Sequence, residues 1–275
     1  MLIGKENLDL KLTLMDSAQC FRWQQRGERF GCVLNGQPVW LWRDDAGIHA
    51  EGDIDVDCIR DYLDLNRDYS AIAREYAHIP QACRAVELYP GLRVLNQPPW
   101  ETLISFIISS NNNVSRIRNL TVALSIHFGT AYGELYAFPT PEQLSSASED
   151  TLRALKVGYR APYLIGAARR VCEGFPLDSL KDLPYEEAHG LLVTLPGVGD
   201  KVADCVLLFG CRHASAFPVD VWVDRLLRSW FGIESASRSA MRRQARALLG
   251  PHAGLMQQFL FHSARMGDIS LEMKT

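Results

Sequence analysis

The sequence predicts an α+β protein: an N-terminal antiparallel β-sheet domain with helices, followed by a helical domain. Two observations support this class. Strand patterns occur only before residue 56, and helical spacing of apolar residues fills the rest of the chain. A length of 275 residues suits two domains of roughly 150 residues each. We place residues 1–97 in the sheet domain and residues 98–275 in the helical domain.

The predicted sheet begins at residues 8–14, where four leucines alternate with polar residues as they do in a half-buried strand. The pair Asn35-Gly36 stands between two β-rich runs and predicts a two-residue hairpin turn. From Val56 onward, apolar residues recur three and four positions apart. We therefore expect the following helices to pack on this sheet.

From Pro98 to the C-terminus we expect helices and no strand pair. Residues 100–110 are apolar on nearly every side, which is typical of a helix in the middle of a bundle. Further helices are expected at residues 114–128, 141–147, 149–155, 161–173, 185–194, 201–210, 221–230, 238–249 and 253–265.

Composition and charge exclude several classes of protein. Apolar residues make up 47% of the chain and charged residues 22%, which excludes a disordered or fibrous chain. The net charge of −3 argues against coating nucleic acid by bulk electrostatics, although an arginine-rich stretch from Arg225 to Arg246 predicts a local basic face. The seven cysteines lack zinc-ligand spacing, and we expect them to be reduced. Because no apolar leader or membrane span is visible, we expect a cytoplasmic protein without membrane contact.

Two glycines that flank Val198, Gly197 and Gly199, lie between two helical patterns in the stretch from residue 185 to 210. A tight hairpin of this kind can hold a phosphate on its backbone N–H groups. The alternative is an ordinary helix–helix turn in which glycine relaxes the end of the first helix. The stretch matches neither a Walker loop nor a dinucleotide-binding fingerprint.

Lys201 falls in the first turn of the following helix, where the helix dipole disfavours a cation. The dipole and partial burial both favour the neutral amine, which is the form a nucleophile requires. Cys205 lies one turn later on the same face, so it faces whatever Lys201 attacks. The alternative for Cys205 is a small buried hydrophobe.

Asp220 precedes an apolar helical pattern and stands where an N-cap belongs. Beside an amine nucleophile, the same carboxylate could also stabilise a developing cation or relay protons. Both roles remain open for this residue.

Taken together, these stretches resemble the 8-oxoguanine DNA glycosylases of the helix-hairpin-helix (HhH-GPD) superfamily, in a bacterial branch. The resemblance implies a TBP-like N-terminal sheet domain and a helical glycosylase domain, and it runs in the family's order over residues 8 to 265. It is carried by Gln19-Cys20-Phe21-Arg22-Trp23, Ser109-Ser110-Asn111-Asn112-Asn113, Gly158-Tyr159-Arg160-Ala161, Leu195 to Gly199, Lys201 to Cys205, and Pro218-Val219-Asp220-Val221.

The resemblance implies that Lys201 attacks the sugar C1′ of a flipped 8-oxoguanine nucleotide, expels the base and leaves a Schiff base. Strand cleavage by β-elimination follows. Asp220 assists departure of the base, and residues Gly197, Val198 and Gly199 hold DNA phosphate, with a structural monovalent cation on the hairpin carbonyls as an open expectation. No catalytic metal or organic cofactor is implied.

By the same resemblance, Cys205 and Phe261 sandwich the extruded base and Gln257 hydrogen-bonds its Watson–Crick edge. The backbone carbonyl at Ala18 reads the extra N–H of the oxidised base, although relatives have glycine there. Trp222 stands where eukaryotic relatives have histidine, and a bacterial branch explains this. Helix core for Phe261 and a solvated side chain for Gln257 are equally open.

The resemblance also assigns residues to the place that the base leaves. Asn111 fills the gap, Tyr159 wedges beside it, and Arg116 and Arg160 contact the opposite cytosine. The alternatives are a helix cap for Asn111 and solvated charges for the arginines. The implied partner is double-stranded DNA that contains 8-oxoguanine, bound by a monomer.

Two other functions remain as alternatives. A non-catalytic helix-hairpin-helix protein would bind DNA through phosphates alone, with strong salt dependence. A superfamily glycosylase for another damaged base, such as an alkylated purine, would generally lack the hairpin lysine. Lys201 together with Asp220 argues against both.

Overall fold

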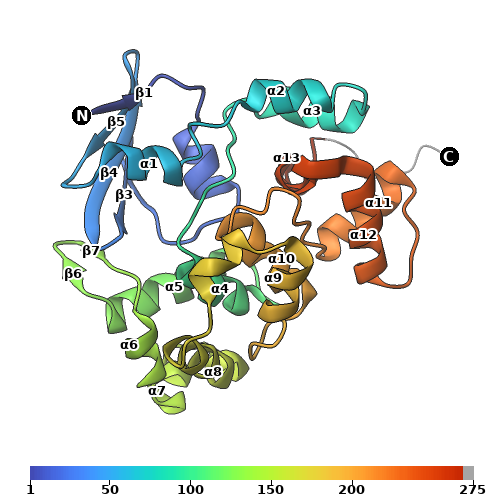
Figure 1. The fold of residues 1–275 in the computed structure, drawn as a ribbon. Helices are drawn as coiled ribbons and strands as arrows, with labels where there is room; N and C mark the ends of the chain where they lie inside the picture. The colour runs from blue at the N-terminus through green and yellow to red at the C-terminus, as the bar shows by residue number, and fades with distance from the viewer. Residues whose placement is uncertain (269–275) are drawn as a thin grey trace.

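Five strands form one antiparallel sheet near the N-terminus of the computed structural model, which describes residues 1–268 (Figure 1). Asn35 and Gly36 join two of these strands in two residues with φ of 49° and 76°, as a type I′ turn requires. The predicted hairpin is therefore confirmed. The order β1-β5-β4-β3-β2 is built from β1 (Leu2–Gly4), β2 (Gln24–Arg26), β3 (Arg29–Leu34), β4 (Gln37–Asp44) and β5 (Gly47–Glu51).

The strand predicted at residues 8–14 is wrong, because the chain forms a helical turn there that continues as η1 (Leu12–Asp16), a π-helix. Asp9 accepts a hydrogen bond from the Leu12 N–H at 2.9 Å and stabilises this turn. Leu10 and Leu14 are buried all the same, because residues four apart share one side of a helical turn. The alternation thus predicted the burial of three of the four leucines, but it missed the burial of Thr13 and the conformation.

Helices make up most of the remaining chain, and each of the ten predicted after residue 97 is present with ends within two residues. A short antiparallel pair, β6 (Ala131–Tyr132) and β7 (Leu135–Tyr136), contradicts the expectation of no strands there. No helix within residues 1–268 is long and apolar enough to cross a membrane. The α-helices are α1 (Val56–Tyr62), α2 (Tyr69–Glu75), α3 (Pro80–Leu88), α4 (Pro99–Ser109), α5 (Val114–Phe128), α6 (Pro141–Ser145), α7 (Glu149–Ala154), α8 (Ala161–Cys172), α9 (Tyr185–Leu192), α10 (Asp200–Phe209), α11 (Val221–Phe231), α12 (Arg238–Leu249) and α13 (Ala253–Met266).

Two apolar cores hold these elements together. Helix α1 packs on the sheet through Ile59, as expected. Helices α2 and α3 instead join the core of the helical part, where α3 packs against α13 (Figure 1). The Tyr76 hydroxyl also donates to the Leu249 carbonyl at 2.5 Å. Helical spacing predicted the apolar face of α2 and α3 but not the partner that covers it.

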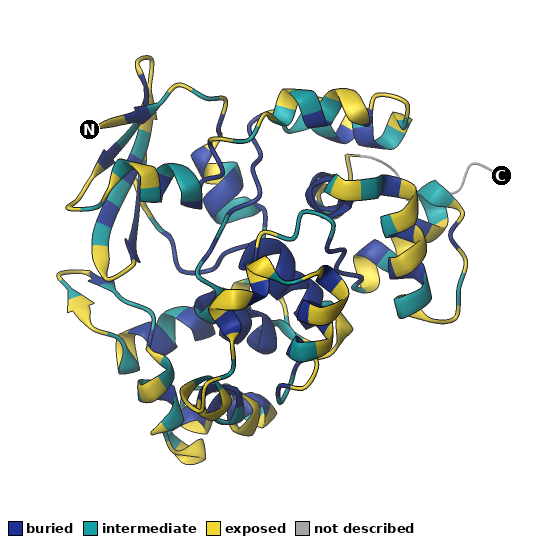
Figure 2. Ribbon diagram, viewed as in Figure 1, coloured by how far each residue is buried: buried dark blue, intermediate teal, exposed yellow. Residues whose placement is uncertain are grey.

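Helix α4 runs through the middle of the helical part and is buried over most of its length, as predicted (Figure 2). A buried ion pair ties it to the sheet: the Arg22 guanidinium donates to both carboxylate oxygens of Glu101, at 3.0 and 2.7 Å. The same guanidinium donates to the carbonyls of Val33 in β3 and Tyr136 in β7. One side chain therefore joins three separate segments.

Replacing Arg22 by alanine should lower the free energy of unfolding by about 3–5 kcal/mol, because Glu101 would keep a buried charge without its partner. Urea denaturation measures this. Arg26→Ala is the matched control: its ion pair with Glu134 is exposed, so we expect a loss of only ~0–1 kcal/mol. Equal losses in the two variants would contradict an anchoring role for Arg22.

Candidate active site

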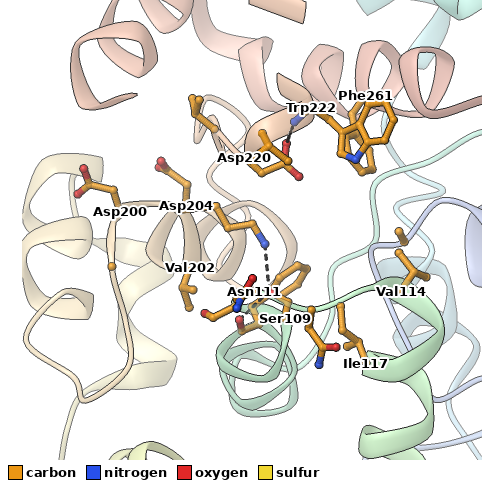
Figure 3. A pocket seen from close by; sticks show the side chains of 18 of the residues that line it. Ser109, Asn111, Val114, Ile117, Asp200, Val202, Asp204, Asp220, Trp222 and Phe261 are labelled. Carbon is orange, nitrogen blue, oxygen red and sulfur yellow. Dashed lines mark hydrogen bonds between the residues drawn. The ribbon is translucent and has the colours of Figure 1, made fainter. Parts of the chain in front are cut away.

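A cleft of about 920 Å³ opens between the end of α4, the beginnings of α5, α10 and α11, and one side of α13 (Figure 3). Lys201, Asp220, Phe261, Ala18 and Asn111 all line it. A smaller recess of about 50 Å³ shares several of these walls and adds two predicted residues, Cys205 and Gln257. The structure thus brings the predicted catalytic and base-binding residues to one place.

Lys201 is the second residue of α10, and its amine is held inside the cleft. Nζ donates a hydrogen bond to the Ser109 Oγ at 3.0 Å and lies 4.9 Å from the centre of the Phe106 ring (Figure 3). The Ser109 hydroxyl donates in turn to the Phe106 carbonyl at 2.7 Å, so its oxygen is free to accept from Lys201. Ser109 was given no role from the sequence. Its only signal there is its place just before the Asn111–Asn113 triplet.

Asp220 is the N-cap of α11, and a single carboxylate oxygen provides the cap. Its Oδ1 accepts from the N–H groups of Trp222 and Val223, both at 2.9 Å. Neither bond uses Oδ2, and Asp220 lines the cleft together with Lys201 (Figure 3). The two roles considered for this residue are therefore compatible, because capping fixes the carboxylate in orientation while leaving one oxygen for chemistry.

The recess is lined by one neutral thiol and one unpaired amide. Cys205 is buried, and burial raises the pKa of its thiol to about 12 although Lys201 acts in the opposite direction. The thiol therefore stays protonated near neutral pH and presents an uncharged wall. Gln257 is also buried, and its Oε1 has no hydrogen-bond partner within residues 1–268. An unpaired buried oxygen costs about 1–3 kcal/mol, which favours a ligand site over a solvated side chain.

The predicted hairpin joins α9 to α10 and requires glycine at its centre. Gly197 has φ of 78°, and a Cβ atom there would lie 2.7 Å from the Cβ atom of Tyr163 in α8. Gly199 is the N-cap of α10 and lines the cleft beside Lys201. The tight turn is confirmed, whereas its phosphate contacts stay a prediction.

The residues predicted to contact the opposite strand meet around the loop between α4 and α5. Asn111 has φ of 50° at the edge of the cleft. Arg160 is buried, and its guanidinium donates to the carbonyls of Ser110, Asn111 and Val157. The alternative of a solvated charge therefore does not apply to Arg160. Tyr159 and Arg116 are exposed next to it.

Comparison with known proteins identifies the family. Residues 1–103 match the family described as 8-oxoguanine DNA glycosylase, N-terminal domain, and residues 104–251 match the HhH-GPD superfamily of base excision DNA repair proteins. A crystal structure of Clostridium acetobutylicum 8-oxoguanine glycosylase/lyase with double-stranded DNA is 32% identical, covers 96% of this chain and 94% of its own, and superposes with a TM-score of 0.89. The chain belongs to the 8-oxoguanine DNA glycosylase family.

Curated members of this glycosylase family are longer than the matched region. The N-glycosylase/DNA lyase of Saccharomyces cerevisiae is 42% identical over 60% of this chain and 48% of its own length. The N-glycosylase/DNA lyase OGG1 of Arabidopsis thaliana is 37% identical over 62% of this chain and 51% of its own length. The matches thus span about half of these relatives. Gln257 and Phe261 lie beyond residue 251, where the superfamily match ends.

A buried polar network at the wall of the cleft received no role from the sequence. Asp204 of α10 accepts from the Tyr185 hydroxyl at 2.5 Å and from Arg242 of α12 at 3.4 Å. Arg242 also donates to His189 at 2.5 Å. Burial raises the pKa of the Asp204 carboxyl to about 7, although both donors oppose this. One arginine of the predicted basic face is therefore buried, and the network joins α9, α10 and α12.

We expect Asp204 to make stability depend on pH. A folded-state pKa raised from 3.8 to about 7 means that the fold binds this proton more tightly than the unfolded chain does, so the stabilisation is lost as pH rises through 7. Relative to Asp204→Asn, the wild-type free energy of unfolding should fall by roughly 2 kcal/mol between pH 5 and pH 8. Urea titrations at both values test this. The exposed Asp178, changed to Asn, is the matched control. A difference in free energy of unfolding between the wild type and Asp204→Asn that does not change with pH would contradict the raised pKa of Asp204.

Proposed function

We propose that this protein removes 8-oxoguanine from duplex DNA, preferably opposite cytosine, and then cleaves the strand at the abasic site. The observation that carries the proposal is the pairing of an amine and a carboxylate in one cleft: Lys201, held by Ser109, and Asp220, fixed by its capping bonds. We further propose that it acts as a monomer in the bacterial cytoplasm, where the DNA substrate lies.

The chemistry requires a neutral amine and a flipped nucleotide. The lone pair of Lys201 Nζ forms a bond to the sugar C1′, and the bond from C1′ to the base breaks, so that the base leaves with the electron pair and is protonated. Opening of the sugar ring and loss of a proton from nitrogen give a Schiff base. Removal of a C2′ proton then expels the 3′-phosphate. The Asp220 carboxylate stabilises the positive charge that develops at C1′.

The oxidised base would occupy the recess between Cys205 and Phe261, with Gln257 at its Watson–Crick edge and the Ala18 carbonyl at position 7. The recess of about 50 Å³ is smaller than a purine, since one water takes up ~30 Å³ of the liquid. Phe261 is the partly exposed aromatic wall of the recess, and we expect it to move when the base enters.

The duplex would be held on both sides of this cleft. The N–H groups of Gly197 to Gly199 suit a phosphate. A monovalent cation on the hairpin carbonyls is an additional proposal. Asn111 and Tyr159 would fill the gap, with Arg116 at the opposite base. Arg160 would have to exchange its bonds to the Asn111 loop to reach a base.

Borohydride should trap a covalent adduct between this protein and a duplex that contains 8-oxoguanine. Lys201→Gln should reduce trapping by about 10³-fold or more, because the substituted amide cannot form a Schiff base. Lys181→Gln, a change at an exposed lysine, should trap as the wild type does. An adduct that survives Lys201→Gln would rule out this nucleophile, whereas binding without any adduct would favour the non-catalytic alternative.

Excision should be fastest when cytosine lies opposite the lesion. Arg116→Ala should lower the preference for cytosine over the other bases by about tenfold, because one good arginine contact to a base is worth ~1–3 kcal/mol. Single-turnover cleavage of four duplexes, one for each opposite base, measures this. Arg153→Ala, an exposed arginine of α7, is the control. Equal wild-type rates for all four duplexes would refute the preference.

A further inference from the structure

Three successive carbonyls before Ala18 are bound by side chains from the helical part of the molecule. Arg118 of α5 donates to the Met15 carbonyl at 2.5 Å, and Arg265 of α13 donates to the Asp16 carbonyl at 2.5 Å. Gln258, also of α13, donates to the Ser17 carbonyl at 2.7 Å. Two helices distant in sequence thus fasten one short segment of the sheet domain.

Hydrogen bonds also hold the chain on the other side of Ala18, at Gln19. The Gln19 carbonyl accepts from Gln97 at 2.7 Å, and the Gln19 side chain spans from the Arg93 carbonyl to the Leu95 N–H. The carbonyls of residues 15, 16, 17 and 19 are therefore all bonded. Within residues 1–268, the Ala18 carbonyl is the exception in this run.

Ala18 itself has a backbone conformation that its neighbours must impose. Its φ is 59°, in the left-handed region that residues other than glycine rarely adopt. Strained residues of this kind persist where the surrounding structure fixes them, and they gather at functional sites. Ala18 lines both the cleft and the recess, beside Lys201 and Phe261.

The hydrogen bonds to residues 15–17 leave other polar atoms of the same arginines without partners. Stability alone therefore does not explain these bonds. Arg118 Nε and Arg265 Nη1 are buried and have no hydrogen-bond partner within residues 1–268. Placing two cations side by side at the same segment is unfavourable unless the position of that segment matters. The position that it determines is that of the Ala18 carbonyl.

We propose that Arg118, Gln258 and Arg265 are positioning residues that determine selectivity for oxidised over unmodified guanine. The inference rests on the proposed function. At position 7 the oxidised base presents an N–H donor, whereas guanine presents a lone pair. A carbonyl that cannot move accepts a hydrogen bond from the N–H of the oxidised base and repels the lone pair of guanine. A carbonyl free to turn away would no longer repel guanine.

Arg118 offers the cleanest test, because it touches this segment without lining the cleft or the recess. Arg118→Ala should lower the ratio of single-turnover excision rates for 8-oxoguanine and guanine, both opposite cytosine, by about tenfold, as expected for loss of one charged hydrogen bond. Cleavage of a preformed abasic site, which needs no base recognition, should stay within about twofold. Arg84→Ala, an exposed arginine of α3, should change neither quantity.

Gln258→Ala and Arg265→Ala should lower the same ratio, and thermal unfolding shows whether each variant is folded. Ala18→Gly provides a rescue, because glycine adopts a positive φ without strain. In the double variant with Arg118→Ala, the ratio of excision rates should be about threefold higher than in Arg118→Ala alone. A merely structural role of Arg118 would not produce this increase.

Two kinds of failure are distinguishable. A wild-type protein that does not excise 8-oxoguanine would overturn the proposed function and this inference with it. A wild type that excises it selectively, with Arg118→Ala leaving the ratio unchanged or lowering abasic-site cleavage to the same extent, would overturn the positioning role alone.

Discussion

The packing of α10 against α4 is the contact on which the rest of the site depends. Phe106 and Phe209 stack at 5.4 Å between these helices, and the amine of Lys201 reaches Ser109 across the same interface. Gly210 allows the close approach, since a Cβ atom there would lie 3.1 Å from the backbone of Pro99. Because both helices are largely buried, the backbone of Lys201 is held in place, and its amine stays within reach of Ser109.

Several polar groups are buried around this contact, and they position rather than stabilise. Asp204 and Arg242 form one pair at the wall of the cleft, Arg22 and Glu101 form another, and each pair joins helices or strands from different parts of the chain. Buried ion pairs contribute little net stability, because desolvation offsets their attraction. Their directional bonds do fix which segments meet, and that geometry is what a cleft built from distant segments requires.

The walls of the cleft and recess come from segments with separate origins, which suits an enzyme that must examine a base as well as remove it. The amine and the carboxylate belong to the helical part, whereas Ala18 belongs to the segment before the sheet. Under the proposed function, recognition of the base therefore depends on how the two parts are joined. Arg118, Gln258 and Arg265 make that junction rigid at the point closest to the recess.

The sequence by itself determined the helices and the Asn35-Gly36 turn, and it singled out Lys201 and Asp220 as candidates, because these follow from local spacing and from residue type. It did not determine the conformation of residues 8–14, since burial of alternate leucines suits a strand or a helical turn equally. Nor could it assign roles to Ser109, Asp204 or Arg118. Their polar atoms form hydrogen bonds with partners that lie more than thirty residues away in the sequence or on another helix. Tertiary structure decided these because hydrogen bonds depend on position in space, and local spacing carries no information about which distant segment will be the neighbour.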